Sequence, residues 1–234
     1  GASLDAYDAL RRYLAAHLAG DVELVQRATY AEVNAMVSTG EVDVAFVCSG
    51  AFVDGRRRFG MELLVVPTIQ GQDAYYSLVI VPSGSYAQRV EDLRGRSFAF
   101  TDPLSNTGHL APSYLLSEMS EIPERFFSHI SFTRSHDNSI RAVADGVVDG
   151  AAVDSLVYDF AIERDRSLAA RTRVVHRSGP FGMPPVVVRP GLEESLKARL
   201  RAAFLGMEHD PAATPARQAL RIDRFALAEL HAYA

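Results

Sequence analysis

Short apolar runs that alternate with amphipathic segments are the feature that most constrains the fold of this chain. Residues 42–47 form a mostly apolar run of the kind found in strands buried on both faces, and residues 30–38 have helical spacing and end at Gly40. Residues 63–67 and 75–81 are predicted as the next strands. This alternation of strand, helix and strand predicts an α/β fold with mostly parallel sheets flanked by helices.

The rest of the chain continues the same alternation. A helix is predicted over residues 5–18, and a short strand over residues 22–25. Further on, the predictions are helices over residues 88–93, 109–119, 138–144 and 155–164 and strands over residues 97–100, 130–133, 150–153 and 173–177. Residues 178–185 are rich in Gly and Pro and are predicted as a linker. A strand over residues 186–188 and helical regions over residues 193–205 and 223–233 complete the predictions.

This order of elements is explained by two lobes between which the chain crosses twice. The pattern starts afresh after residue 81, so residues 79–181 are expected to form a second lobe, while residues 1–78 plus 182–234 form the first. Such an arrangement places a ligand cleft between the lobes, where the carboxyl ends of strands and the amino ends of helices converge. Polar residues at those ends are therefore the candidate site residues.

Length and charge narrow the class of protein. The chain has 234 residues, 48% of them hydrophobic and 23% charged, so an ordinary globular protein with a sizeable core is expected. The net charge of −5 argues against a nucleic-acid surface, because binding phosphates requires clustered Lys and Arg. No run approaches the ~20 apolar residues of a membrane span. The single cysteine, Cys48, excludes an internal disulfide, and no motif for a metal or a cofactor is present.

The most informative loop covers residues 101–108, between a predicted strand and a predicted helix. Ser105, Asn106 and Thr107 offer hydroxyl and amide donors, and Gly108 permits close approach of the backbone. The helix N-terminus adds unpaired N–H groups and a partial positive charge. The loop is therefore a candidate anion site, although the same residue types also serve as ordinary N-caps.

A second polar turn, residues 135–139, also leads from a strand into a helix. Its histidine, His136, can donate a hydrogen bond to an oxyanion and can change charge near neutral pH. Taken alone, the same residue is equally well explained as a helix cap or a surface side chain. The other histidines have no spacing that would suit a bound metal.

Four further positions lie at the ends of predicted strands. Cys48 and Ser49 follow residues 42–47, Tyr75 opens the strand that leads toward the second lobe, and Asp154 follows residues 150–153. Three of them also have a structural explanation: a buried thiol for Cys48, core packing for Tyr75 and helix capping for Asp154. Catalysis by Cys48 would need a nearby base, and no Cys–His signature is present.

In combination, several of these segments resemble a known family. They are residues 40–46, 75–81, 92–96 with 98–100, 102–108, 135–136 and 146–152, spread over nearly the whole chain. The resemblance is to the phosphonate, phosphite and phosphate family of ABC-transporter solute-binding proteins, a branch of the two-lobed type II periplasmic binding fold. It implies an extracytoplasmic protein that captures a small oxyanion by lobe closure for an ABC permease, without an enzymatic step.

The resemblance also implies roles for particular residues. In the family the loop before the second-lobe helix binds phosphonate oxygens, which points to Ser105, Asn106 and Thr107, with Asn106 in place of the usual hydroxyl residue. A tyrosine before the crossing strand and the histidine of the Ser-His turn also bind the oxyanion, which points to Tyr75 and His136.

The matching segments further suggest the kind of ligand. Family members that bind an aminoalkyl phosphonate add carboxylates for the ammonium group, and here at most Asp154 remains. A buried ammonium without a partner is costly, so the expected ligand is phosphite, phosphate, a simple phosphonate or a related oxyanion without an amine.

Two other functions stay open. Cys48 departs from the family, whose transport members commonly lack a thiol there, and related two-lobed proteins sense arsenite through a cysteine in the cleft. The second hypothesis is therefore a ligand-sensing domain for a histidine kinase. The third is an enzyme on a similar scaffold, with Cys48 or His136 as the reactive group.

The first residues, Gly1 to Asp5, lack the basic and apolar regions of a signal peptide. A mature extracytoplasmic protein would begin in the same way, so the expected periplasmic location is unaffected. The family opens with a strand ahead of the first helix, and the resemblance therefore implies that some N-terminal sequence precedes residue 1.

Overall fold

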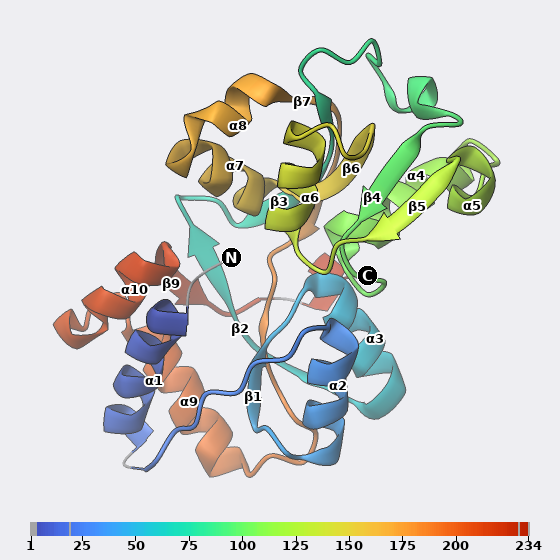
Figure 1. Ribbon diagram of the computed structural model, residues 1–234. Coiled ribbons are helices and arrows are strands. Elements are labelled where there is room, and N and C mark those ends of the chain that lie inside the picture. The colour runs from blue at the N-terminus through green and yellow to red at the C-terminus, as the bar shows by residue number, and fades with distance from the viewer. Residues whose placement is uncertain (1–3, 19, 229, 234) are drawn as a thin grey trace. The chain divides into compact units, whose positions relative to one another are not determined.

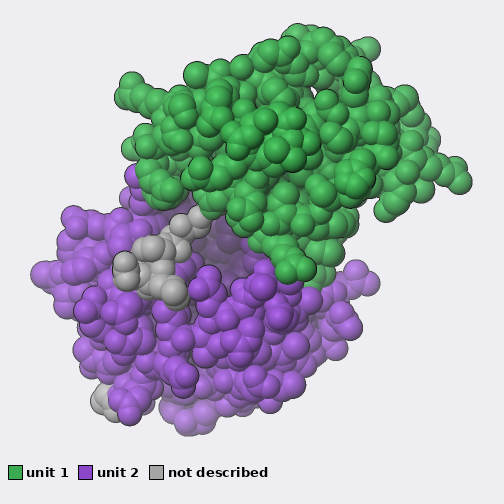
Figure 2. Space-filling view, viewed as in Figure 1, with its two compact units in different colours: residues 1, 75–181 green, residues 2–74, 182–234 purple. Residues whose placement is uncertain are grey.

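The computed structural model describes residues 4–18, 20–228 and 230–233, which form two compact units (Figures 1 and 2). Unit 1, green in Figure 2, is built from residues 75–181. Unit 2, purple in Figure 2, is built from the described residues up to Ala74 and from Gly182 onward. The chain therefore leaves unit 2 after Ala74 and returns to it at Gly182. The opening residues 1–3 lie outside the described residues.

Unit 1 contains a mixed sheet with the strand order β5-β4-β6-β3-β7. Its strands are β3 (Ala74–Pro82), β4 (Ser97–Phe100), β5 (His129–Phe132), β6 (Gly150–Asp154) and β7 (Thr172–Gly182). β4 pairs in parallel with both β5 and β6, whereas β3 runs antiparallel to β6. The carboxyl ends of β4, β5 and β6 consequently lie at one edge of the sheet, where β3 begins.

Helices cover both faces of this sheet (Figure 1). They are α4 (Ala111–Glu118), α5 (Pro123–Phe126), α6 (His136–Ala144), α7 (Ser155–Arg164) and α8 (Arg166–Arg171), with the short turns η1 (Val90–Leu93) and η2 (Asn106–Leu110). Alternate residues of β3 enter two different cores: Leu78 and Ile80 pack with α6, α7 and α8, while Val79 and Val81 pack with η1, α4 and α5. Burial on both faces explains why this strand is almost continuously apolar.

Unit 2 contains a sheet with the strand order β1-β8-β2-β9. Its strands are β1 (Val44–Phe46), β2 (Glu62–Ile69), β8 (Val186–Val188) and β9 (Ile222–Ala226). β8 pairs antiparallel with both β1 and β2, and β9 pairs antiparallel with β2. The returning segment of the chain is thus inserted between two strands of the N-terminal segment.

The helices of unit 2 come from both ends of the chain. They are α1 (Leu4–Leu18), α2 (Tyr30–Thr39), α3 (Ser49–Phe59), α9 (Glu194–Gly206) and α10 (Thr214–Leu220), with the 3-10 turns η3 (Pro211–Ala213) and η4 (Leu230–Tyr233). Local sequence sets their ends: Thr29 and Glu32 form a capping box for α2, and Gly40 ends it at a φ of 77°. Phe204, Met207 and Phe225 lie in the core that joins α1, α9 and α10 to the sheet.

The α/β class is confirmed, but the expected parallel pairing in unit 2 is wrong. Residues 42–47 form a strand only over Val44–Phe46, and it pairs antiparallel with β8. An apolar run shows that a strand is buried on both faces but does not show the direction of its neighbour. β1 and β2 do point the same way, yet β8 separates them.

Three local predictions are also wrong. Residues 22–25 form no strand, and Leu24 and Val25 are exposed, since a run this short lacks a sheet to join. Residues 178–182 continue β7 instead of forming a linker, because an edge strand tolerates Gly and Pro. The region 223–233 is not a helix: it holds β9 and the turn η4, while the helix α10 precedes it.

Lys197 provides a test of how α9 is held on β2. Its side chain is buried, and Nζ donates to Glu62 Oε2 at 2.8 Å and to Glu194 Oε1 at 2.6 Å. We expect Lys197→Ala to lower the free energy of unfolding by about 1 to 2 kcal/mol, through lost ion pairs and lost packing of the stem. Lys197→Met keeps the stem and should lose less than half of that in urea denaturation. Equal losses would show that the stem does not contribute.

Candidate functional site

The candidate site lies in unit 1, at the edge where β4, β5 and β6 end. Thr101 follows β4, His136 begins the helix after β5, and Asp154 is the last residue of β6. Tyr75 lies near the start of β3, and Ser77 of β3 pairs in register with Asp154. The strand pairing thereby brings polar residues from β3, and from the ends of β4, β5 and β6, to one edge of the sheet.

Residues 105–108 form the turn that follows β4. The expected helix begins earlier than His109, as the π-helical turn η2, and continues as α4 from Ala111. Ser105 is the N-cap: its Oγ accepts a hydrogen bond from the Gly108 N–H at 3.0 Å, and its carbonyl accepts from Leu110 at 3.0 Å. π-Helical turns are rare and occur frequently at functional sites.

Gly108 has no room for a side chain. A Cβ atom there would lie 1.8 Å from Thr101 Oγ1 and 2.9 Å from Ser105 Oγ. The Thr101 N–H also donates to the Gly108 carbonyl at 3.2 Å, which fixes the turn against the end of β4. Glycine at this position therefore permits the close approach of two backbone segments.

The backbone carbonyl of Thr107 is hydrogen-bonded, but its side-chain hydroxyl is not. The Ser77 hydroxyl donates to the Thr107 carbonyl at 2.6 Å. The Thr107 side chain is fully buried, and its Oγ1 has no hydrogen-bond partner among the described residues, as is also true of Thr101 Oγ1. An unpaired buried hydroxyl costs about 1 to 3 kcal/mol, so its retention in a polar turn points to a partner from outside the chain.

Asn106 and Tyr75 meet beside this turn. Asn106 Nδ2 donates to the Tyr75 hydroxyl at 3.3 Å. The Tyr75 ring is fully buried and packs edge-on against Phe181, with 6.2 Å between the ring centroids. This packing fixes the ring, so the hydroxyl is held at the turn.

His136 is the first residue of α6, and its tautomer is set by a backbone contact. The Asp154 N–H donates to His136 Nδ1 at 3.1 Å, so Nδ1 is unprotonated and the ring proton is on Nε2. Burial lowers the pKa of His136 to about 4, against a smaller opposing effect of Asp137. At neutral pH the ring is therefore an uncharged donor through Nε2.

Asp154 caps α7 from the end of β6. Its Oδ1 accepts from the Leu156 N–H at 2.8 Å and from the Val157 N–H at 3.2 Å. Burial raises the pKa of the carboxyl group to about 7, although these two hydrogen bonds favour the charged form. Asp154 is thus a buried acid that titrates near neutral pH.

The sequence-predicted residues divide between the two units. The structure brings Tyr75, the 105–108 turn, His136 and Asp154 to one edge of unit 1. Cys48 and Ser49 lie in unit 2, where Cys48 is the buried N-cap of α3. A ligand contact by Cys48 or Ser49 stays a prediction.

Two residues of the site were missed by the sequence reasoning. Ser77 was hidden within an apolar strand, although one hydroxyl among apolar neighbours was a usable signal. Thr101 was noted only as the first residue of the loop, and its position over Gly108 depends on the folded turn.

Among the described residues, no group of three His, Cys, Asp or Glu side chains is placed to hold a metal ion. None of the helices described has both the length and the apolar character needed to cross a bilayer.

The fold and the comparisons with known proteins define the class of periplasmic binding proteins. Residues 2–233 match the family described as ABC transporter, phosphonate, periplasmic substrate-binding protein. The chain therefore belongs to this family, whose members are extracytoplasmic substrate-binding components of transporters and not enzymes.

Individual relatives agree with this family. The chain is 28% identical over 210 residues to the phosphate-import protein PhnD of Mycolicibacterium smegmatis, a match that covers 85% of this chain and 65% of the relative. The chain thus spans slightly less than two thirds of that relative's length.

Two solved structures share the fold. The binding protein of a phosphonate ABC transporter from Pseudomonas aeruginosa has a TM-score of 0.90 at 20% identity, over 97% of this chain and 77% of that one. PhnD1 from Prochlorococcus marinus, in complex with methylphosphonate, has a TM-score of 0.87 at 17% identity, over 97% of this chain and 88% of that one.

The opposite pKa shifts of His136 and Asp154 predict a testable pH profile. The lowered pKa of His136 makes the folded state more stable as the pH rises from about 4 to 6.5, by about 3 kcal/mol. The raised pKa of Asp154 makes it less stable as the pH rises from about 4 to 7, by about 4 kcal/mol. In the wild type the two contributions largely cancel.

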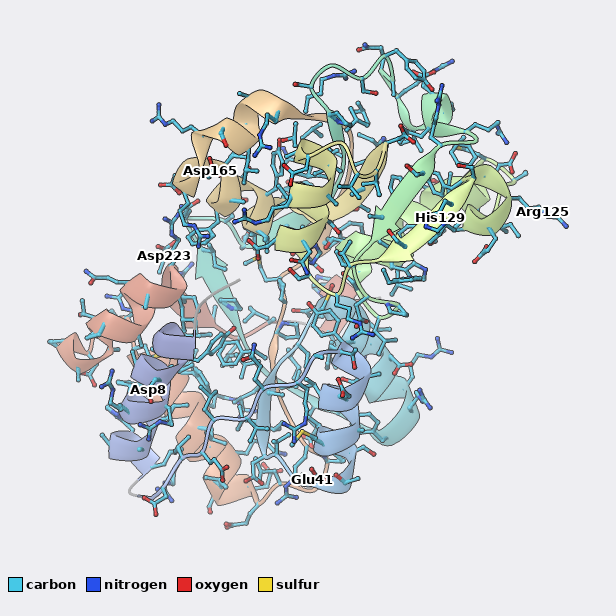
Figure 3. All side chains as sticks on the ribbon, viewed as in Figure 1. Asp8, Glu41, Arg125, His129, Asp165 and Asp223 are labelled. Carbon is cyan, nitrogen blue, oxygen red and sulfur yellow. The ribbon has the colours of Figure 1, made fainter. Side chains whose placement is uncertain are left out.

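Single substitutions should separate the two opposite effects of pH on the free energy of unfolding. In His136→Asn only the Asp154 effect remains, so the free energy of unfolding should fall as the pH rises from about 4 to 7. In Asp154→Asn only the His136 effect remains, so it should rise as the pH rises from about 4 to 6.5. Chemical denaturation at several pH values measures both, and His129→Asn, at an exposed position on β5 (Figure 3), is the control. Parallel profiles for all four proteins would contradict the shifts.

Proposed function

We propose that unit 1 of this chain binds a small phosphorus oxyanion (phosphite, phosphate or a simple phosphonate) for delivery to an ABC permease. The donors of the site are the Thr107 hydroxyl, His136 Nε2–H and the N–H groups at the start of η2. A tetrahedral oxyanion accepts several hydrogen bonds at once, and neutral donors at a helix N-terminus suit it.

The observation that carries this proposal is the unpaired hydroxyl of Thr107. Other polar groups of the turn have partners within the protein: Ser105 Oγ accepts from Gly108, and the Thr107 carbonyl accepts from Ser77. The Thr107 Oγ1, by contrast, is buried and without a partner in the described chain. The Thr101 hydroxyl, which lies over Gly108, shares the unpaired state of Thr107. A bound oxyanion would supply the missing acceptor in a turn already shaped for an anion.

The type of ligand is supported by the relatives. The mycobacterial relative is a phosphate-import protein, and the Prochlorococcus protein was solved with methylphosphonate. Both ligands are tetrahedral phosphorus oxyanions without an amine. In the two segments where the resemblance would place carboxylates for an ammonium group, residues 153–156 and 182–185, at most Asp154 remains, which supports the same choice.

No observation favours the alternative functions. Cys48, on which an arsenite sensor would depend, is a buried residue that begins α3 in unit 2. The family is one of transport proteins, so an enzymatic function has no support either. Capture by lobe closure, a peripheral contact with the permease, and a readout by a sensor kinase stay predictions.

Substitution of Thr107 tests the proposal. In Thr107→Val an isosteric methyl replaces the unpaired hydroxyl, so the ligand-free protein should be as stable as the wild type or more stable by about 1 kcal/mol. Its affinity for phosphite, phosphate or methylphosphonate, measured by isothermal titration calorimetry, should fall about 10- to 100-fold, the effect of a lost hydrogen bond to a charged ligand.

The control is Thr107→Ser, which retains the hydroxyl and should bind within a few-fold of the wild type. Unchanged affinity in Thr107→Val would remove the observation on which the proposal depends. Failure of the wild-type protein to bind any of the three anions would reject the ligand class itself.

A further inference from the structure

One face of β3 lies against the turn that follows β4. Side chains two positions apart on a strand share a face, so Tyr75 and Ser77 lie on one side of β3 and Tyr76 on the other. The Ser77 hydroxyl donates to the Thr107 carbonyl at 2.6 Å. Asn106 Nδ2 donates to the Tyr75 hydroxyl at 3.3 Å. The strand thus presents two hydroxyl groups to the turn, one to its backbone and one to a side chain.

Packing holds the Tyr75 ring beside Asn106. The ring is fully buried and lies edge-on against Phe181, with 6.2 Å between the ring centroids. The backbone behind it is also closely packed, since a Cβ atom at Gly179 would lie 3.2 Å from the Tyr75 carbonyl oxygen. Rotation of the hydroxyl group about its C–O bond is therefore the main freedom that this side chain retains.

The direction of the Asn106 hydrogen bond determines where the hydroxyl proton points. The amide N–H donates to the phenol oxygen, so the proton on that oxygen cannot point at the same amide group. It is directed to a different acceptor. A hydroxyl group that accepts a hydrogen bond is also polarised into a better donor, because hydrogen bonds in a chain strengthen one another. Asn106 thereby prepares Tyr75 to donate.

The backbone and the side chain of Asn106 have separate tasks. Asn106 is the first residue of η2, so its N–H group is one of those at the start of the turn. It directly precedes Thr107, whose unpaired hydroxyl marks the proposed anion position. Its side chain, by contrast, donates to Tyr75. The phenol oxygen is therefore held within hydrogen-bond reach of the residue next to Thr107.

We propose that Asn106 is a positioning residue, whose side-chain amide directs the hydroxyl proton of Tyr75 toward the bound oxyanion. The side chain of Asn106 acts through Tyr75 and does not itself bind the ligand, whereas its backbone N–H stays among the donors at the start of η2. This inference rests on the proposed function and gives the two side chains different roles in it.

A double-mutant cycle with methylphosphonate as the ligand tests this assignment. Tyr75→Phe removes the donor but keeps the ring, and its affinity should fall about 10- to 100-fold in calorimetric titrations. Asn106→Ala keeps the backbone N–H and should lose about 3- to 10-fold, since the phenol remains but is no longer oriented. The double variant should match Tyr75→Phe within about twofold, because a positioning residue has no effect once the group that it positions is gone.

Multiplied losses in the double variant would show that the Asn106 side chain binds the ligand directly, and would overturn the inference. Wild-type affinity in either single variant would also overturn it. Urea denaturation of the ligand-free variants separates positioning from a general structural role, since affinity losses that follow losses of stability would contradict positioning. Asn106→Leu, which keeps the branched shape of the side chain without its donor, should repeat the result of Asn106→Ala.

Tyr76→Phe is the matched control. It removes the hydroxyl of the neighbouring tyrosine on the opposite face of β3, where the Arg177 guanidinium lies 3.5 Å from the ring centroid. Its affinity for methylphosphonate should equal that of the wild type within about twofold. A loss as large as that of Tyr75→Phe would overturn the inference. If the wild type bound no phosphorus oxyanion, the proposed function would fail, whereas binding with multiplied losses would reject only the role of Asn106.

Discussion

The parallel pairing of β4 with both β5 and β6 determines which residues of unit 1 meet. Parallel neighbours end at the same edge, so the turns that follow them are gathered there without any contact between their side chains being needed. β3 adds Tyr75 and Ser77 because it runs the other way and begins where the others end. The sheet thus assembles donors from segments that are up to 80 residues apart.

Whether each buried polar group has a hydrogen-bond partner determines which of these residues can still donate to a ligand. Backbone contacts fix Ser105, Gly108 and His136, and the His136 contact even selects the ring nitrogen that carries the proton. The hydroxyls of Thr101 and Thr107 are the exceptions, since neither has a partner among the described residues. The proposed anion site would therefore be rigid before a ligand arrives, which would limit the entropy lost on binding.

Sequence patterns predicted the α/β class and the polar turns after β4 and β5, because β4 and β6 are short, mostly apolar runs and turn residues follow β4 and β5. They failed where tertiary pairing overrides local pattern. The direction of β1 depends on β8, more than 130 residues later, and the Gly and Pro residues of β7 are tolerated only because β7 is an edge strand.

The details of the site were beyond sequence patterns for the same reason. Ser77 and Thr107 are 30 residues apart, and the donor role of His136 depends on the backbone of Asp154. Turn composition indicated candidate donors. It could not show which hydroxyl lacks a partner, since that is a property of the packed structure.

The insertion of β8 between β1 and β2 has a consequence for synthesis of the chain. Unit 1 is one continuous segment and can be completed once residue 181 has been made, but β1 and β2 have no neighbour in common until residues 186–188 follow. Until then the N-terminal strands present open edges, which in a growing chain invite pairing with other chains. The sheet of unit 2 therefore closes late, and the interval before β8 emerges is the stage at which the nascent protein is most exposed to aggregation.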